Sequence, residues 1–170
     1  PLSLCKGATV ASVTGTKSLK FYAASTGGTP LVGTTALATK TYFVSETISG
    51  SETPRVSLSV IVNLLPATPS ALVSTESALI CKYIGSSTPV TFTATATGAS
   101  SYIWTAPTGA VIDPDGGQAF ISFEDVSATP GPIGSVTVKI VDANGCISLP
   151  KVLALTTALP KAPTSLVMTS

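Results

Sequence analysis

Histidine is absent from this 170-residue sequence, and charged residues make up only 10% of it. Without an imidazole, the Ser–His–Asp and Cys–His arrangements of nucleophilic catalysis are excluded. Nine lysine and arginine residues and eight acids give a formal net charge of +1. The basic residues are scattered, so the chain lacks the basic patch of a nucleic-acid-binding protein. The composition predicts a protein that is not an enzyme and binds no nucleic acid.

Long hydrophobic runs are also missing, although 44% of the residues are hydrophobic. Proline and glycine interrupt every apolar segment, so none reaches the roughly 18–20 residues that a membrane-spanning helix requires. We therefore expect no membrane insertion. The sequence starts at Pro1 without a methionine, from which we expect an excised or processed fragment of a longer protein.

Serine and threonine are abundant: together they form over a quarter of the chain and alternate with aliphatic residues. A period of two is typical of half-buried strands, and it is clearest at 56–62 and 90–97. About seven such segments, separated by turn signals, follow residue 70, as expected for an antiparallel β-sandwich. No segment shows a helical period of useful length. We therefore predict an all-β fold.

One motif occurs twice, 94 positions apart: residues 65–73 and residues 159–167 both read L-P-x-x-P-x-x-L-V. Two prolines in front of a strand are typical of a joint between tandem modules, because proline restricts the backbone. A tandem array is therefore expected. The predicted division is a β-sandwich module with a truncated first strand at 1–64, a Pro-rich linker at 65–70, a second β-sandwich module at 71–158, and the linker and first strand of a following repeat at 159–170.

Local patterns predict further features of these modules. Strands at 41–47 and 55–62 form a hairpin, and Tyr42 is expected to anchor the preceding connection through its hydroxyl. Residues 9–13 alternate and predict a strand, and residues 78–81 are expected to continue a broken first strand of the second module. Asp142-Ala143-Asn144-Gly145 predicts a hairpin turn, since Asn-Gly tolerates positive φ.

The three cysteines are an odd number, which leaves at least one of them unpaired within the chain. Aligning the two hairpin turns places Ser51 where the second module has Cys146, and Cys81 precedes the second strand of that module. We therefore predict a Cys81–Cys146 disulfide, worth roughly 3–5 kcal/mol, and a free thiol at Cys5. The alternative is that all three are small, reduced, buried residues. Without histidine or a C-x-x-C spacing, a zinc site is disfavoured.

The sequence contains candidate residues for a calcium site and for a sugar-binding site. Asp113 and Asp115 can supply oxygens to Ca²⁺, but Pro114 fixes the backbone between them and favours a Pro-Asp-Gly β-turn. No other cofactor is expected.

Trp104 can stack on a sugar or lie in the core, and its place on the third strand favours the core. The pattern leaves open which face of this strand is buried, the one with Tyr102 and Trp104 or the one with Ile103. A row of threonines can contact glycans or simply face solvent as strand threonines do: Thr91, Thr93, Thr95 and Thr97.

Several segments carry a resemblance to a known family. In the first module these are C-K-G-A-T-V at 5–10, L-K-F-Y at 19–22, G-G-T-P-L at 27–31 and T-Y-F-V-S-E-T at 41–47. They resemble Ig-like repeats in large secreted proteins of Bacteroidota. The second module is similar to the PKD-like or Ig-like partners of these repeats through 90–98, 99–105, 107–110 and 144–146. The chain departs from the repeats at 50–52, where they carry a cysteine, and this agrees with an unpaired Cys5.

The resemblance implies two tandem Ig-like domains. Proteins of this kind are exported by the type IX secretion system, and the longest are gliding-motility adhesins of the SprB type, which carry many repeats along a surface filament. It implies a non-catalytic, monomeric stalk segment whose partners are neighbouring repeats of the same polypeptide. The cysteines and the low charge also favour an extracellular, cell-surface location. The alternatives are a module that binds carbohydrate, such as surface polysaccharide, and an accessory domain of a secreted hydrolase. The resemblance assigns no functional residues.

Overall fold

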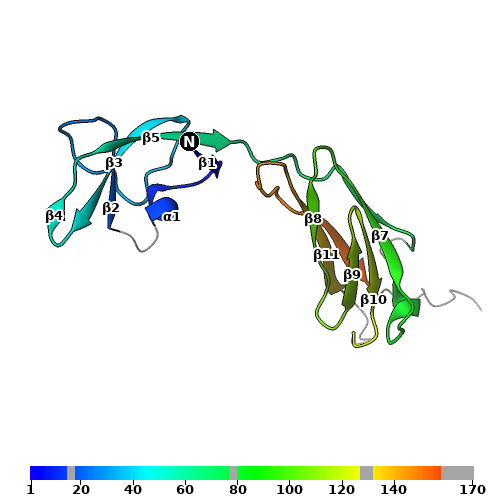
Figure 1. Cartoon of the computed structure of the whole chain (residues 1–170). Coiled ribbons are helices and arrows are strands. Elements are labelled where there is room, and N and C mark those ends of the chain that lie inside the picture. Colours follow the sequence, from blue (N-terminus) through cyan, green and yellow to red (C-terminus); the bar gives the residue numbers. More distant parts are fainter. Residues whose placement is uncertain (15–17, 77–79, 127–131, 158–170) are drawn as a thin grey trace, which may run out of the picture. The chain divides into compact units, whose positions relative to one another are not determined.

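A computed structural model of the chain describes residues 1–14, 18–76, 80–126 and 132–157 (Figure 1). The chain divides into two compact units. The first comprises Pro1–Pro66 and Asp142–Cys146, and the second comprises Ala67–Val141 and the residues from Ile147 on. Strands dominate both units, which confirms the all-β fold. The strand expected at the start of a following repeat, at 159–170, lies outside the described residues.

The first unit is built on one sheet with the strand order β1 (Leu2–Cys5), β5 (Val56–Asn63), β3 (Lys40–Ile48) and β2 (Leu19–Tyr22), coloured blue to teal in Figure 1. β1 runs parallel to β5, and the other neighbours are antiparallel. The short β4 (Ser51–Glu52) folds back on β3 across Ser49 and Gly50, both of which have positive φ. This turn and the β3–β5 pairing confirm the predicted hairpin.

One face of this sheet is covered by irregular chain rather than by a second sheet. Helix α1 (Val10–Thr14) lies beside residues 31–37, and the Val10 N–H donates to the Thr35 carbonyl at 3.0 Å. The strand predicted at 9–13 is therefore wrong, because Val10–Thr14 form a helix. Ser12 closes a local turn with the Thr9 backbone at 2.7 Å and 2.9 Å, and such side-chain bonds compete with strand pairing. The core beneath consists of Val10, Phe21, Leu37, Tyr42, Val44 and Val60.

Tyr42 anchors the connection before β3 through its hydroxyl, as predicted. Its side chain is 1% exposed, its ring meets Phe21 edge to face with centroids 6.2 Å apart, and its hydroxyl accepts a hydrogen bond from the Ala38 N–H at 3.0 Å. The aromatic ring thus fills the core while its polar end satisfies the backbone of the loop before β3.

The second unit is a sandwich of two antiparallel sheets. One has the order β6 (Ala71–Ser74), β7 (Val90–Thr95), β10 (Gln118–Ser122) and β9 (Val111–Asp115). The other has the order β12 (Lys151–Thr156), β11 (Pro132–Val141) and β8 (Ser101–Thr105). Alternate residues of both sheets meet in a single core, which is the arrangement of a β-sandwich. Its members from these strands include Phe92, Ala119, Ile121, Val136, Val138 and Leu155.

The connection between β6 and β7 contains a 3₁₀ turn at Cys81–Tyr83. Cys81 therefore does not belong to the strand predicted at 78–81, and residues 77–79 lie outside the described residues. Ile80 explains the difference, because it is fully buried and its N–H donates to the Thr156 carbonyl at the end of β12 at 3.4 Å. The chain therefore turns at Cys81 after Ile80 has entered the core.

The third strand of the sandwich, β8, settles which aromatic face is buried. Tyr102 and Trp104 pack against the core, while Ile103 is 40% exposed. The Trp104 indole N–H donates to the Gly116 carbonyl at 3.0 Å. Trp104 is therefore half-buried, with its ring packed against the core and its polar end satisfied. Across the described ranges, the helices are all too short or too polar to cross a bilayer.

Candidate functional site

The pairing of the cysteines differs from the prediction. Cys5, in β1, and Cys146, in the turn after β11, form a disulfide with their Cα atoms 5.5 Å apart, although they are separated by 141 residues in sequence. Cys81 is an exposed free thiol. The predicted Cys81–Cys146 bond and the predicted free thiol at Cys5 are therefore both wrong.

The sandwich itself explains why Cys81 does not reach Cys146. Ile80 is bonded to Thr156, which pairs with Pro132 at the start of β11, so Cys81 lies near that end of the strand. Cys146 follows the opposite end, beyond Val141. Nine residue steps along a strand span roughly 30 Å, whereas disulfide-bonded Cα atoms lie about 4.4–6.8 Å apart. The alignment of the two hairpin turns indicates which residues correspond in the two modules. It does not indicate that Cys81 and Cys146 lie at opposite ends of β11.

The segment that presents Cys146 is a tightly bonded turn. The Asp142 carboxylate accepts hydrogen bonds from the N–H groups of Asn144 and Cys146 at 2.9 Å and 2.8 Å. The Gly145 N–H donates to the Asp142 carbonyl at 3.0 Å, and Gly145 has a φ of 78°, which glycine adopts without a steric penalty. The turn predicted at 142–145 is confirmed, although Gly145 has a positive φ and Asn144 does not. Cys146 is fully buried, so the turn holds its sulfur in a fixed, shielded place.

A second polar arrangement surrounds Glu52 on the sheet face of the first unit that points away from the core. The Glu52 carboxylate receives a salt bridge from the Lys20 ammonium at 2.7 Å and hydrogen bonds from the hydroxyls of Tyr22 and Ser45, both at 2.6 Å. We call Lys20, Tyr22, Ser45 and Glu52 the Glu52 cluster. These donors, Lys20 first and then Ser45 and Tyr22, lower the pKa of Glu52 from 4.5 to about 2, because all of them favour the ionised carboxylate. The Glu52 hydrogen bond in turn raises the pKa of Lys20.

Arg55 closes over the Glu52 cluster. Its guanidinium carbon lies 3.3 Å from the centre of the Tyr22 ring, a stacked cation–π contact. One of its terminal nitrogens donates to the carbonyls of Ala24 and Gly27 at 3.0 Å and 2.6 Å. Tyr22 is only 3% exposed as a result. Since each polar group here has a partner within the protein, the cluster fastens the 23–28 loop and the β3–β4 hairpin to the sheet.

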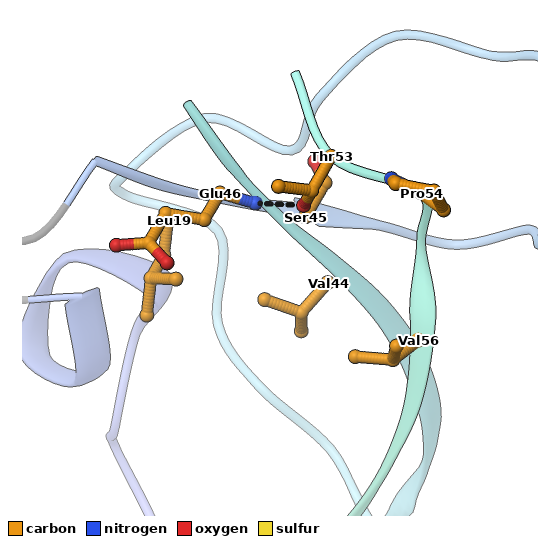
Figure 2. A pocket seen from close by; sticks show the side chains of 7 residues that line it. All are labelled: Leu19, Val44, Ser45, Glu46, Thr53, Pro54 and Val56. Atoms are coloured by element: carbon orange, nitrogen blue, oxygen red, sulfur yellow. Dashed lines mark hydrogen bonds between the residues drawn. The ribbon is translucent and has the colours of Figure 1, made fainter. Parts of the chain in front are cut away.

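A shallow pocket of about 430 Å³ opens beside the same hairpin (Figure 2). Leu19, Val44 and Val56 line it from β2, β3 and β5, and Glu46, Thr53 and Pro54 complete its rim together with Ser45. The hydroxyls of Ser45 and Thr53 are already committed, the first as donor to Glu52 and the second as acceptor from the Glu46 N–H at 3.0 Å. The pocket therefore offers room for a small apolar group and no activated nucleophile.

The acids considered for calcium lie on β9. Asp113 and Asp115 are exposed and point to the same side of the strand, which pairs with β10 up to the turn at Gly116. Among the residues that the structure describes, no group of three or more acids, cysteines or histidines comes together. Two carboxylates supply fewer oxygens than the six to eight that calcium takes.

Of the threonine row, Thr91, Thr93 and Thr95 lie on the outer face of β7, the first two half-buried and the third exposed, and Thr97 is exposed beyond the end of the strand. Val90, Phe92 and Ala94 alternate with this row and enter the core. The same outer face carries Phe120 of β10, which alternates with the buried Ala119 and Ile121 and is half-buried. Its strand neighbours in register are Thr91 on one side and Asp113 on the other. Phe120 was not among the residues predicted from the sequence, although the alternation of residues 118–122 indicates its outward-facing position.

Comparison with known proteins adds little to these observations. No family model matches the chain, and no curated protein does. One of the solved structures that it resembles is described as "Crystal structure of mouse coronavirus receptor-binding domain complexed with its murine receptor". The alignment covers 91% of this chain and 95% of that chain, with 10% sequence identity and a TM-score of 0.38. A likeness at this level carries no argument about fold or function.

Proposed function

We propose that the chain is a non-catalytic structural segment of a tandem array on a cell surface, where it acts as part of an adhesin stalk. The observation that carries this proposal is the place of the repeated L-P-x-x-P-x-x-L-V motif. Its first copy begins at Leu65, passes the boundary between the two units after Pro66, and ends in β6. The second copy begins three residues after Thr156, the last residue of β12. The first copy thus supplies a joint and a first strand after the first unit. The second copy stands at the corresponding place in the sequence after β12, among residues that the structure does not describe.

The joint is restrained by its sequence and by local contacts. Pro66 and Pro69 fix two φ angles, and Pro69 is buried. Directly after it, the Ser70 N–H and hydroxyl both donate to the Thr95 carbonyl of β7, at 2.8 Å and 3.1 Å. A linker with proline and with fixed ends behaves as a semi-rigid spacer rather than as a flexible tether. This is the property that a stalk requires.

The Cys5–Cys146 disulfide supports an extracellular location, because such bonds persist in oxidising compartments. The resemblance to Bacteroidota repeats extends the proposal to export by type IX secretion and to gliding or attachment as the process served. Neighbouring repeats of the same polypeptide are then the principal partners.

Small-angle scattering on proteins with one, two and three tandem copies of the chain tests the stalk. For a semi-rigid array the maximum dimension grows in proportion to copy number, whereas for flexible joints it grows roughly as the square root. The matched variant Pro66→Gly loosens the joint and leaves the buried Pro69 in place, and it should move the growth toward the flexible regime. Square-root growth in the unmodified array would contradict the stalk.

A second candidate function is carbohydrate binding on the outer face of β7, β10 and β9. The observation in its favour is Phe120, an outward-facing aromatic ring whose neighbours are hydroxyls, an amide and carboxylates. Apolar ring faces flanked by hydrogen-bonding groups suit the faces and edges of a sugar. A glycan array compares the unmodified chain with Phe120→Ala and with Ile103→Ala, a control on the opposite sheet. Binding that is lost only in Phe120→Ala supports this function, and the lack of any bound glycan argues against it.

A further inference from the structure

We propose that the Cys5–Cys146 disulfide diverts mechanical tension around most of the chain. A pull that enters before Cys5 and leaves after Cys146 is transmitted through the sulfur–sulfur bond, because the bond is the shortest covalent path between these points. Residues 6–145 then form a closed loop that carries no end-to-end load. The inference rests on the proposed stalk for its biological use, whereas the load path follows from the connectivity alone.

The length removed from the load path is large. The two cysteines are 141 residues apart in sequence but only 5.5 Å apart between Cα atoms. An extended chain covers roughly 3.3–3.6 Å per residue. The closed loop therefore removes roughly 460–500 Å from the length that tension can extend. About 28 residue steps remain outside the loop, and they supply roughly 100 Å at most. The disulfide therefore lowers the maximum extensibility of this 170-residue chain about sixfold.

The structure also shows which elements a pull still reaches. In the described residues these are the part of β1 before Cys5 and the whole of β12. β1 pairs only with β5, but β12 completes the sheet beside β11 and adds the buried Leu155 to the core. Detachment of β12 is thus the step that tension can produce in the second unit while the disulfide is intact. Most of the sandwich, from β6 to β11, lies within the loop.

The bond is shielded from exchange with the third cysteine. Cys146 is fully buried and its turn is closed by the Asp142 carboxylate. The free thiol of Cys81 lies near the start of β11, roughly 30 Å from the end that leads to Cys146. Exchange requires direct attack of a thiolate on a disulfide sulfur, so Cys81 cannot shift the crosslink while the sandwich is folded.

Single-molecule force spectroscopy on the full chain, held by its two ends between marker domains, tests the inference. Without reductant, we expect total unfolding extension of roughly 100 Å or less. Dithiothreitol is applied in denaturant, because Cys146 is fully buried in the folded chain. Its two thiols give up two electrons and two protons as they form a cyclic disulfide, and Cys5 and Cys146 become thiols. A further extension of roughly 460–500 Å should then appear.

Three controls make the result decisive. Peptide mapping under non-reducing conditions identifies the bond that is present, and Cys81→Ser must behave as the unmodified chain does with and without reductant. Cys5→Ser/Cys146→Ser should give the long extension without reductant; if this variant does not fold, the extensions of the oxidised and the reduced native chain, compared in denaturant, test the same point. Long extensions from oxidised native chain, or a mapped Cys81–Cys146 bond, would overturn the inference. The scattering experiment on tandem copies tests the stalk separately, so either idea can fail alone.

Discussion

Tyr42→Phe removes a single oxygen atom from the core of the first unit and tests how that unit is held together. The Tyr42 hydroxyl accepts a hydrogen bond from the Ala38 N–H at 3.0 Å, and the ring is 1% exposed. Phenylalanine keeps the ring and its contact with Phe21 but leaves the Ala38 N–H without this acceptor. The substitution therefore isolates the anchoring role of the hydroxyl from the packing role of the ring.

The expected loss is about 1–2 kcal/mol. A net hydrogen bond contributes about 0.5–1.5 kcal/mol, and a donor left without a partner costs about 1–3 kcal/mol when it is fully buried. The Ala38–Tyr42 bond is only partly buried, so the lower half of that range applies. For a unit of this size, each kcal/mol lowers Tm by about 4–8 °C, and the first unit should melt roughly 5–15 °C lower. Tyr42→Ala should cost more, about 3–5 kcal/mol, because it also empties the core.

The chain provides an internal reference for this measurement. Its single tryptophan, Trp104, packs in the core of the second unit, so tryptophan fluorescence follows that unit alone. Differential scanning calorimetry records both transitions. We expect Tyr42→Phe to shift the calorimetric transition of the first unit and to leave the fluorescence midpoint unchanged.

Two results would refute this reasoning. A shift of the first transition by less than about 1 °C would mean that the hydroxyl contributes nothing measurable. Equal shifts of both transitions would mean that the two units unfold as one. The free energy of unfolding could then not be assigned to each unit separately.

Two further predictions concern the Glu52 cluster and a glycine turn. Because the pKa of Glu52 is lowered from 4.5 to about 2, the ionised carboxylate stabilises the first unit above pH 4.5, and this stabilisation is lost as the pH falls from 4.5 to about 2. Urea midpoints measured across that window should fall in the native chain and in Glu46→Gln, an exposed-acid control, but much less in Glu52→Gln; parallel curves for all three would contradict the assignment. In the second unit, Gly109 has a φ of 85°, and a Cβ there would lie 2.6 Å from the Asp125 carbonyl oxygen. Gly109→Ala should therefore cost more than about 1 kcal/mol by Trp104 fluorescence. Gly116→Ala, at positive φ with open space around it, should cost less, and the opposite order would show that contact with Asp125 is unimportant.

Much of the strand content could be predicted from the sequence, because alternation reports directly which residues face a core. The β3–β5 hairpin, the strand pattern of β7 and the anchoring role of Tyr42 all depend on local patterns of this kind. The strand predicted at 9–13 failed because five residues are too few to distinguish strand alternation from a single helical turn, and the bonds between Ser12 and Thr9 favour the turn.

The candidate sites were predicted less well, because they depend on contacts between distant segments. Cys81 and Cys146 cannot pair because they lie at opposite ends of β11. The spacing of the cysteines along the chain does not indicate at which end of the strand each of these two residues lies. The Glu52 cluster joins residues 20, 22, 45 and 52 through the register of three strands. Glu52 follows a turn that could be predicted, yet only the fold of the hairpin brings its carboxylate back over Ser45.

The disulfide also constrains which parts of the chain can be separated from one another. Cys5 and Cys146 belong to one compact unit, although the residues between 67 and 141 form another. A fragment that kept residues 1–66 but lost the turn at 142–146 would contain every strand of the first unit and still leave Cys5 without its partner. The first unit is therefore complete only when both ends of a 141-residue separation are present.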